Sequence, residues 1–287
     1  MIFLLLSIVF STLTVSFFKV FEIKKIQTFQ AIVVNYLTCG IIGTYLAKTP
    51  VYSAQFWQAP WLMYTLVLGF LFISIFYLIA LTAQKISVAA SMVSAKLSVV
   101  IPVITAWLFL AESLNMLKIL GILLSFIAVF FISARSEPNT EQTGKGFWYL
   151  PVLVFIGSGC IDALLKFLES NYMPAYSADD IVTATFFFAF VFGSTMLIYQ
   201  YVVAQKTVTT KAIAWGFLLG VPNYFSMYFL VETLAIFPAT FIFPINNIGI
   251  VALSTLLAFV VFKEKLSVKN WLGLALALGA ILLISLA

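Results

Sequence analysis

Long apolar segments alternate with short polar ones along the whole chain. Each apolar segment is about as long as the roughly 17–25 residues that cross a bilayer as a helix, and none shows the ~10-residue alternation of a transmembrane strand. Because the chain begins directly with apolar residues and without a basic region, we expect its first segment to be a span rather than a signal peptide. The pattern predicts ten spans, at residues 2–18, 29–47, 60–83, 87–110, 115–133, 147–167, 181–204, 212–234, 238–262 and 268–286.

One long polar segment, residues 135–146, separates the first five predicted spans from the last five. It combines charged residues with Pro138 and Gly144, which favour loops. We therefore expect three parts: a first five-helix repeat at residues 1–134, a linker loop at 135–146, and a second five-helix repeat at 147–287.

The two halves of the chain are related in sequence. Residues 80–134 align without a gap with residues 232–286, at an offset of 152 residues. Five spans per half is an odd number, so equivalent helices must cross the membrane in opposite directions. The predicted fold class is an all-α polytopic membrane protein with ten transmembrane helices arranged as two inverted five-helix repeats. Matching positions include Val99 and Val251, Glu112 and Glu264, Gly121 and Gly273, Ala128 and Ala280, and, with a slightly smaller offset, Gly43 and Gly193.

Composition and charge support a membrane protein and exclude other classes. Hydrophobic residues make up 63% of the chain and charged residues 9%, whereas a soluble domain carries about 25% charged residues. The net charge of +5 comes from lysines scattered in short loops, which predicts orientation signals rather than nucleic-acid binding. Most of these lysines lie in odd-numbered loops, so the positive-inside rule predicts that both termini lie outside.

The chain offers few groups for enzyme chemistry. It contains no histidine, and its two cysteines, Cys39 and Cys160, both lie within apolar spans. No metal-ligand spacing and no Ser–His or Cys–His pairing is present. We therefore expect no enzyme activity, no metal and no cofactor.

Lys96 is the main functional candidate. It lies about ten residues from either end of the fourth span, where a charge costs roughly 2.5–3.5 kcal/mol and normally faces a cavity or a partner. We expect it to contact substrate or a coupling ion, or else to form a structural ion pair. At helical spacing, Ser91, Ser94 and Ser98 share one face of this span, nearly opposite Lys96.

Candidate partners for Lys96 lie on other spans. Asp162 lies in the sixth span and could bind Lys96, or could pair with Lys166 one turn later. Tyr224, Tyr228 and Glu232 share a face of the eighth span at four-residue spacing, although Glu232 stands near the span end, where water could reach it. Tyr77 lies on the polar face of the third span.

The ninth span predicts a second unusual site. Pro244 removes a helical hydrogen bond just before Asn246 and Asn247, and broken helices are typical of midplane binding sites. The two amides either line a pathway or join neighbouring helices. Under the repeat offset they align with Ser94 and Ala95, beside Lys96. Pro102 in the fourth span and Pro222 in the eighth are further hinge candidates, together with Pro244.

The repeated Glu112 and Glu264 stand at span ends, and Asn115 and Ser267 follow three residues later as predicted N-caps. We interpret these glutamates as parts of tight turns.

Taken together, these motifs resemble the EamA-type family of the drug/metabolite transporter superfamily. The residues that carry the resemblance are Ala80-Leu81-Thr82-Ala83, Pro102, Ala111-Glu112-Ser113-Leu114 and Gly121, and in the second half Glu264-Lys265-Leu266, Trp271 and Gly273. The resemblance implies a secondary transporter of small metabolites with a central cavity between the halves. It also implies cytoplasmic termini, against the lysine count, so the orientation stays open. Exchangers of this superfamily bind anionic ligands through lysines in the fourth and ninth helices, and Lys96 alone matches that arrangement here.

We therefore expect a permease of the bacterial inner membrane that moves a small polar metabolite by alternating access. Its expected partners are the metabolite, a coupling proton or counter-substrate, and the lipid bilayer, with no nucleic acid, in a monomer or homodimer. The alternatives are a lipid-linked sugar flippase and a non-transporting membrane sensor or assembly protein.

Overall fold

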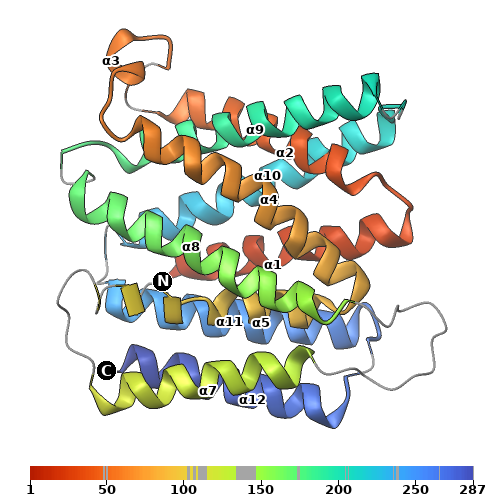
Figure 1. Cartoon of the computed structure of the whole chain (residues 1–287), viewed down its shortest axis with the longest axis vertical. Helices are drawn as coiled ribbons and strands as arrows, with labels where there is room; N and C mark the ends of the chain where they lie inside the picture. Colours follow the sequence, from red (N-terminus) through yellow and green to blue (C-terminus); the bar gives the residue numbers. More distant parts are fainter. Residues whose placement is uncertain are drawn as a thin grey trace. The chain divides into compact units, whose positions relative to one another are not determined.

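The regular structure in the described part of the chain is helical (Figure 1). The computed structural model describes residues 1–47, 49, 51–101, 104–105, 108, 115–133, 147–172, 175–203, 205, 207–234, 236, 239–264 and 266–286. Its helices are α1 (Ile2–Ile23), α2 (Thr28–Leu46), α3 (Ala54–Trp57), α4 (Leu62–Lys85), α5 (Val88–Leu97), α7 (Met116–Ser133), α8 (Tyr149–Asn171), α9 (Ala178–Val202), α10 (Thr210–Leu234), α11 (Ala239–Val260) and α12 (Val268–Ser285).

These helices suit a bilayer. Within the described residues, α1, α2, α4, α9 and α10 contain stretches long and apolar enough to cross a membrane, and α5, α7, α8, α11 and α12 contain shorter apolar helices. Large apolar side chains point outward, such as Phe130 at 72% and Met63 at 70% exposure, which is costly in water and favourable against lipid. The chain is therefore a polytopic helical membrane protein. The predicted linker, residues 135–146, lies outside the described residues.

The fourth predicted span is interrupted. Helix α5 ends at Leu97, a turn follows at Ser98 and Val99, and helical structure resumes at Val100. Pro102 lies outside the described residues, but a proline has no N–H to donate to the carbonyl four residues earlier, which is that of Ser98. The amide of Ile101 donates to the Ser98 carbonyl instead, at 2.8 Å. The break thus follows from the position of Pro102 in the sequence.

The break expected in the ninth span is absent. Helix α11 is continuous from Ala239 to Val260, so it runs through Pro244, and α10 likewise contains Pro222 within its length. A proline removes one hydrogen bond, and neighbouring helices can hold such a helix together. The expectation of a broken helix at Pro244 is therefore wrong for the described backbone.

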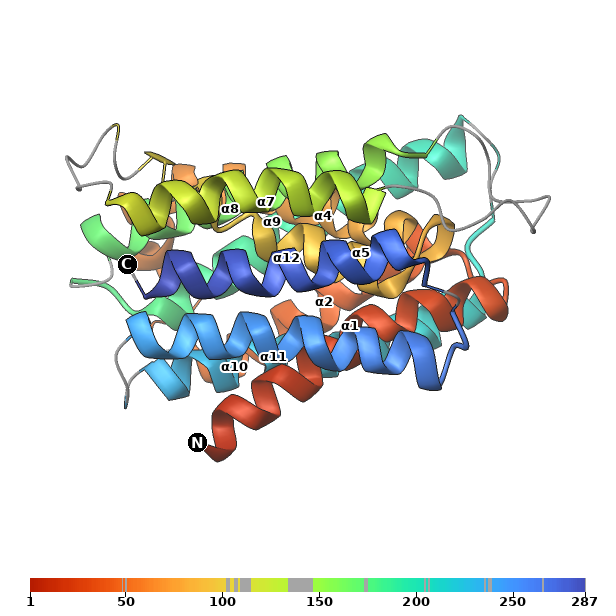
Figure 2. The same ribbon diagram turned by 90° about the horizontal axis from the view of Figure 1, so that it is seen from below.

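The chain forms two compact units, which are described separately. The first unit is Met1–Val20, Leu78–Asp162 and Phe225–Ala287, and the second is Phe21–Tyr77 and Ala163–Tyr224. In the first unit α7 packs against α12, and α5 packs against α11 (Figures 1 and 2). In the second unit α2 packs against α9. Each pair consists of helices that the repeat makes equivalent.

The contacts between α2 and α9 are reciprocal. A Cβ atom at Gly43 would lie 2.7 Å from Oγ1 of Thr183, and one at Gly193 would lie 2.7 Å from Cγ2 of Val33. Gly193 follows Gly43 by 150 residues, and Thr183 follows Val33 by the same number. The late part of each helix therefore meets the early part of the other, in an antiparallel contact that both copies make in the same way.

The same antiparallel arrangement joins α7 and α12. Gly121, early in α7, faces the Ala280 carbonyl and Ile284, which are late in α12. Ala128, Ala280 and Ile284 belong to one buried apolar cluster of the first unit. Small residues at these positions let the two backbones approach closely.

Close packing also joins α10 to α2 within the second unit. Gly216 and Gly220 are four residues apart, as in a GxxxG motif. A Cβ atom at Gly216 would lie 2.6 Å from the Ala31 carbonyl oxygen, and one at Gly220 would collide with Thr38. Beside this contact, Nδ2 of Asn223 donates a hydrogen bond to Oδ1 of Asn35 at 3.1 Å.

Replacing Gly220 with Ala should therefore destabilise the protein. The added methyl group would force α10 away from α2, and overpacking of this kind costs about 1–3 kcal/mol. Gly40→Ala is the matched control, because a Cβ atom there meets nothing within 4 Å. Thermal unfolding in detergent should show a lower midpoint for Gly220→Ala and an unchanged or higher one for Gly40→Ala. Equal midpoints for the two variants would contradict the close contact.

Candidate functional site

Lys96 and Asp162 come together in the first unit. Lys96 lies in the last turn of α5 and Asp162 lies in α8. Both side chains are partly buried, and their opposite charges attract each other. The structure thus brings Asp162, one of the predicted partners, close enough to Lys96 for their charges to interact. The side chain of Lys166, the other predicted partner of Asp162, lies outside the described residues.

Ser98 completes this cluster. Its Oγ lies 2.8 Å from Oδ2 of Asp162 and 2.6 Å from the carbonyl oxygen of Ala95. Ser98 is the residue that follows α5, and its backbone angles are still helical, with φ −55° and ψ −18°. Ser98 and Lys96 act on the same carboxylate, although helical spacing predicts that they lie on nearly opposite faces.

The other two serines of α5 behave differently. Ser91 donates a hydrogen bond to the carbonyl oxygen of Ile79, at 2.9 Å, and so joins α5 to α4. Ser94 is fully buried, and its Oγ has no hydrogen-bond partner among the described residues. A buried hydroxyl without a partner costs free energy. Ser94 is therefore an unsatisfied polar group two residues before Lys96 in the chain.

Asn246 belongs to a second polar cluster of the first unit. Oγ of Ser7 in α1 lies 2.9 Å from the Ser226 carbonyl oxygen in α10 and 3.3 Å from Oδ1 of Asn246 in α11. Asn246 is 2% exposed, and its neighbour Asn247 is half-buried. These contacts fit the predicted alternative in which the amide joins helices. Sequence reasoning missed Ser7 and Ser226, although each is a small polar residue in an apolar span.

An aromatic surface borders this cluster. Phe229 stacks against Phe3, with ring centroids 5.8 Å apart, and against Phe10, at 5.7 Å. Phe3 and Phe10 flank Ser7 on α1, and Phe229 follows Ser226 by three residues. The Ser7 cluster thus combines hydrogen-bonding atoms with an apolar wall.

The predicted tyrosine candidates pack against phenylalanine rings. The pairs are Tyr77 with Phe29 at 5.3 Å, Tyr224 with Phe186 at 6.1 Å, and Tyr228 with Phe225 at 6.1 Å. Tyr224 belongs to the second unit and Tyr228 to the first. Glu232 is half-buried in the last turn of α10. Their predicted contact with substrate stays a prediction.

Glu264 confirms the turn interpretation and extends it. Its carboxylate accepts a hydrogen bond from the backbone amide of Val88, with N–O distances of 3.3 and 3.4 Å, at the first turn of α5. Oε1 of Glu264 also lies 3.7 Å from Nζ of Lys19. A negative charge at a helix N-terminus is stabilising, so this turn holds the start of α5. Glu112, its repeat equivalent, lies outside the described residues.

Both predicted N-caps are confirmed. Oδ1 of Asn115 accepts a hydrogen bond from the Lys118 amide at 2.9 Å. Ser267 forms a capping box with Asn270 at the start of α12. Helices α7 and α12 therefore begin where the sequence predicted.

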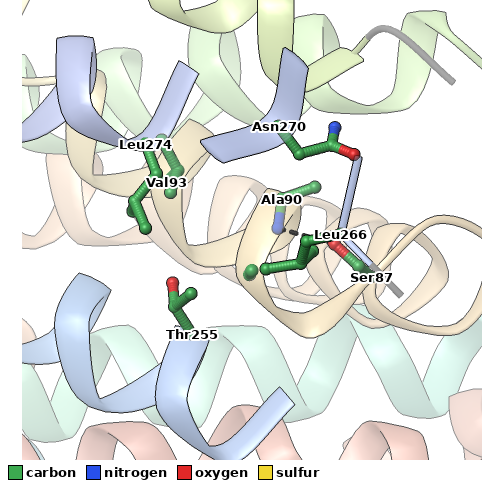
Figure 3. Close-up of a pocket in the computed structure, with 8 residues that line it drawn as sticks. Ser87, Ala90, Val93, Thr255, Leu266, Asn270 and Leu274 are labelled. Atoms are coloured by element: carbon green, nitrogen blue, oxygen red, sulfur yellow. Dashed lines mark hydrogen bonds between the residues drawn. The ribbon is translucent and has the colours of Figure 1, made fainter. Parts of the chain in front are cut away.

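A small pocket lies at the start of α5 (Figure 3). Its free space of about 10 Å³ has room for about one water molecule. Ser87 lines it and accepts a hydrogen bond from the amide of Ala90, at 2.9 Å. Thr255, late in α11, faces these early residues of α5, which makes the α5–α11 contact antiparallel. None of the predicted substrate residues lines this pocket.

Removing either charge of the Lys96–Asp162 pair should destabilise the protein, because the remaining charge loses its partner in an apolar environment. The cost of breaking a fully buried pair is about 3–5 kcal/mol, and we expect less here because both side chains are partly exposed. The double variant Lys96→Met with Asp162→Asn should lose less stability than the sum of the single losses. Thermal unfolding of the four proteins in detergent measures this coupling. Additive losses would mean that the two charges do not interact.

Comparison with known proteins shows what parts of this chain are similar to. Residues 150–286 match the model of the EamA-like transporter family. A protein of uncharacterized function from Haemophilus influenzae is 29% identical over 274 residues, which cover 92% of this chain and 90% of the relative. A protein of known crystal structure has the same fold, with a TM-score of 0.60 over 98% of this chain and 97% of the other, at 13% identity. Residues 150–286 of the chain are therefore similar to the EamA-like transporter family.

Proposed function

We propose that the chain is a secondary transporter that moves a small polar metabolite across the membrane by alternating access. The observation that carries this proposal is the cluster of Lys96, Asp162 and Ser98. Charged side chains within membrane helices are costly, and by default they mark a pathway for substrate or ions. The family relationship supports transport as the activity, and the cluster supplies groups that could bind a polar solute.

We further propose ten spans in two inverted five-helix repeats. The packing of α7 on α12, of α5 on α11 and of α2 on α9 supports this arrangement. In each pair a helix contacts its own repeat equivalent in the antiparallel direction, as a two-fold axis in the membrane plane requires. Two halves related in this way can exchange roles, which provides two states open to opposite sides.

The substrate site of this transporter would be built on α5 and α8. Lys96 and Asp162 are the proposed binding residues, and Ser94 and Ser98 supply neighbouring hydroxyl groups. Asn246 and Asn247, on the helix that packs against α5, are further candidates. Pro102, Pro222 and Pro244 are the proposed hinge positions, and the bacterial inner membrane is the proposed location.

Transport should depend on Lys96. A hydrogen bond to a charged group is worth about 1.5–3 kcal/mol, so we expect Lys96→Met to lower the transport rate by about tenfold or more. Labelled metabolites that raise the thermal stability of the purified protein would be tested for counterflow in proteoliposomes. Lys85→Met is the matched control, because Lys85 is exposed at the end of α4. Full transport by Lys96→Met would refute the proposed role of this residue.

A further inference from the structure

The hydroxyl group of Ser98 lies near two acceptors but has a single hydrogen. The Ala95 carbonyl oxygen lies at 2.6 Å and Oδ2 of Asp162 at 2.8 Å. If Asp162 is ionised, Ser98 can donate to one of these oxygens and must leave the other. If Asp162 carries a proton, the acid donates to Oγ of Ser98 while Ser98 donates to Ala95. Both short contacts are then hydrogen bonds at the same time.

The second arrangement also satisfies the backbone carbonyl group of Ala95. Because α5 ends at Leu97, the carbonyl groups of its last turn lack helical partners. Ser98 supplies a donor to one of them, that of Ala95. An orphan carbonyl in an apolar environment is costly, so the protonated acid leaves the end of α5 better satisfied than the ionised acid does.

Charge balance links this proton to a ligand. With Lys96 and Asp162 both ionised the pair has no net charge, and in the described part of the chain each is the charged group that acts on the other. Lys166, one turn after Asp162 in α8, is described by its backbone alone. An anionic group bound at Lys96 would leave one uncompensated negative charge, which is costly at low dielectric. A proton on Asp162 removes that charge. A cationic ligand would instead require Lys96 to lose its proton. Among the described residues, no contacts like those of Ser98 with Asp162 and Ala95 would favour a neutral Lys96.

We propose that Asp162 binds one proton whenever an anionic group, such as a carboxylate or a phosphate, binds at Lys96, so that proton and anion cross the membrane together. The proton adds to the Asp162 carboxylate on one side and returns to water on the other. Ser98 is a positioning residue that accepts the hydrogen bond of the acid. This inference rests on the proposed transport function, because it assigns the coupling of the same site.

Infrared difference spectroscopy tests the proposal without knowledge of the natural substrate. The protein, with ¹³C-labelled aspartate, is reconstituted in phosphatidylcholine vesicles and titrated from acidic to alkaline pH. We expect a band of a protonated aspartic acid that is lost in Asp162→Asn and retained in Asp180→Asn. Acetate, as the anionic probe, should move the titration midpoint to higher pH, by about one unit per tenfold increase in acetate once binding is saturating. Methylammonium, the cationic control, should not.

Two further variants keep the test decisive if Asp162→Asn fails to fold. In Lys96→Met the acid loses its counter-charge, so the band should persist to alkaline pH and no longer respond to acetate. In Ser98→Ala the acid loses its neighbouring hydroxyl group, so the midpoint should move while its response to acetate remains. A band that survives Asp162→Asn, or a midpoint that acetate leaves unchanged in the wild type, overturns the proposal.

The transport assay separates this inference from the function on which it rests. A midpoint that responds to acetate in a protein with no counterflow activity would refute transport and leave the coupled site intact. Counterflow with a midpoint that ignores acetate would support transport and refute the coupling.

Discussion

The structure depends on helices that pack against their own repeat equivalents. In such a contact the residue that protrudes from one helix must fit the recess of the other, and the same must hold with the roles exchanged. Gly43 receives Thr183 and Gly193 receives Val33, so each copy supplies the glycine of one contact and the side chain of the other. A change in one copy alone would disturb a surface that is complementary to itself.

This constraint gives a physical reason for the sequence repeat. The clearest match, residues 80–134 with 232–286, includes helices α5 and α7 and their partners α11 and α12. Matching positions such as Ala128 and Ala280 lie in one buried cluster. The matches therefore gather where the two copies meet. The two halves differ in sequence at the charged position. The first half has Ser94-Ala95-Lys96, and the aligned residues of the second half, Asn246-Asn247-Ile248, include no lysine.

Helix geometry and chemistry meet at the end of α5. Pro102 cannot donate to the Ser98 carbonyl, and α5 accordingly stops at Leu97. Ser98, the next residue, lies 2.8 Å from Oδ2 of Asp162 and 2.6 Å from the Ala95 carbonyl oxygen. The end of α5 thus holds a hydroxyl, a carboxylate and an ammonium group within an apolar environment, where each of them is costly alone.

Local features of the chain could be predicted from sequence. Span positions follow from the length of apolar segments, and the caps at Asn115 and Ser267 follow from residue type and spacing, because these properties involve neighbours in the chain. The partner of Lys96 could be guessed as Asp162 because so few charges lie in the spans. The contact of Ser98 with Asp162 could not, because it joins residues 64 positions apart in the chain. The continuity of α11 through Pro244 could not be predicted either, because a proline in a helix removes one hydrogen bond without necessarily ending the helix.

By itself the sequence determined an all-helical membrane protein with a costly charge at Lys96, because apolar length and residue charge can be read along the chain. Tertiary structure alone decided which groups meet. It joined Ser7 to Ser226 and Asn246, Gly220 to Thr38, and Glu264 to Val88. The distance along the chain in each of these contacts is large, so close approach and hydrogen-bond geometry, which no local pattern encodes, select the partners.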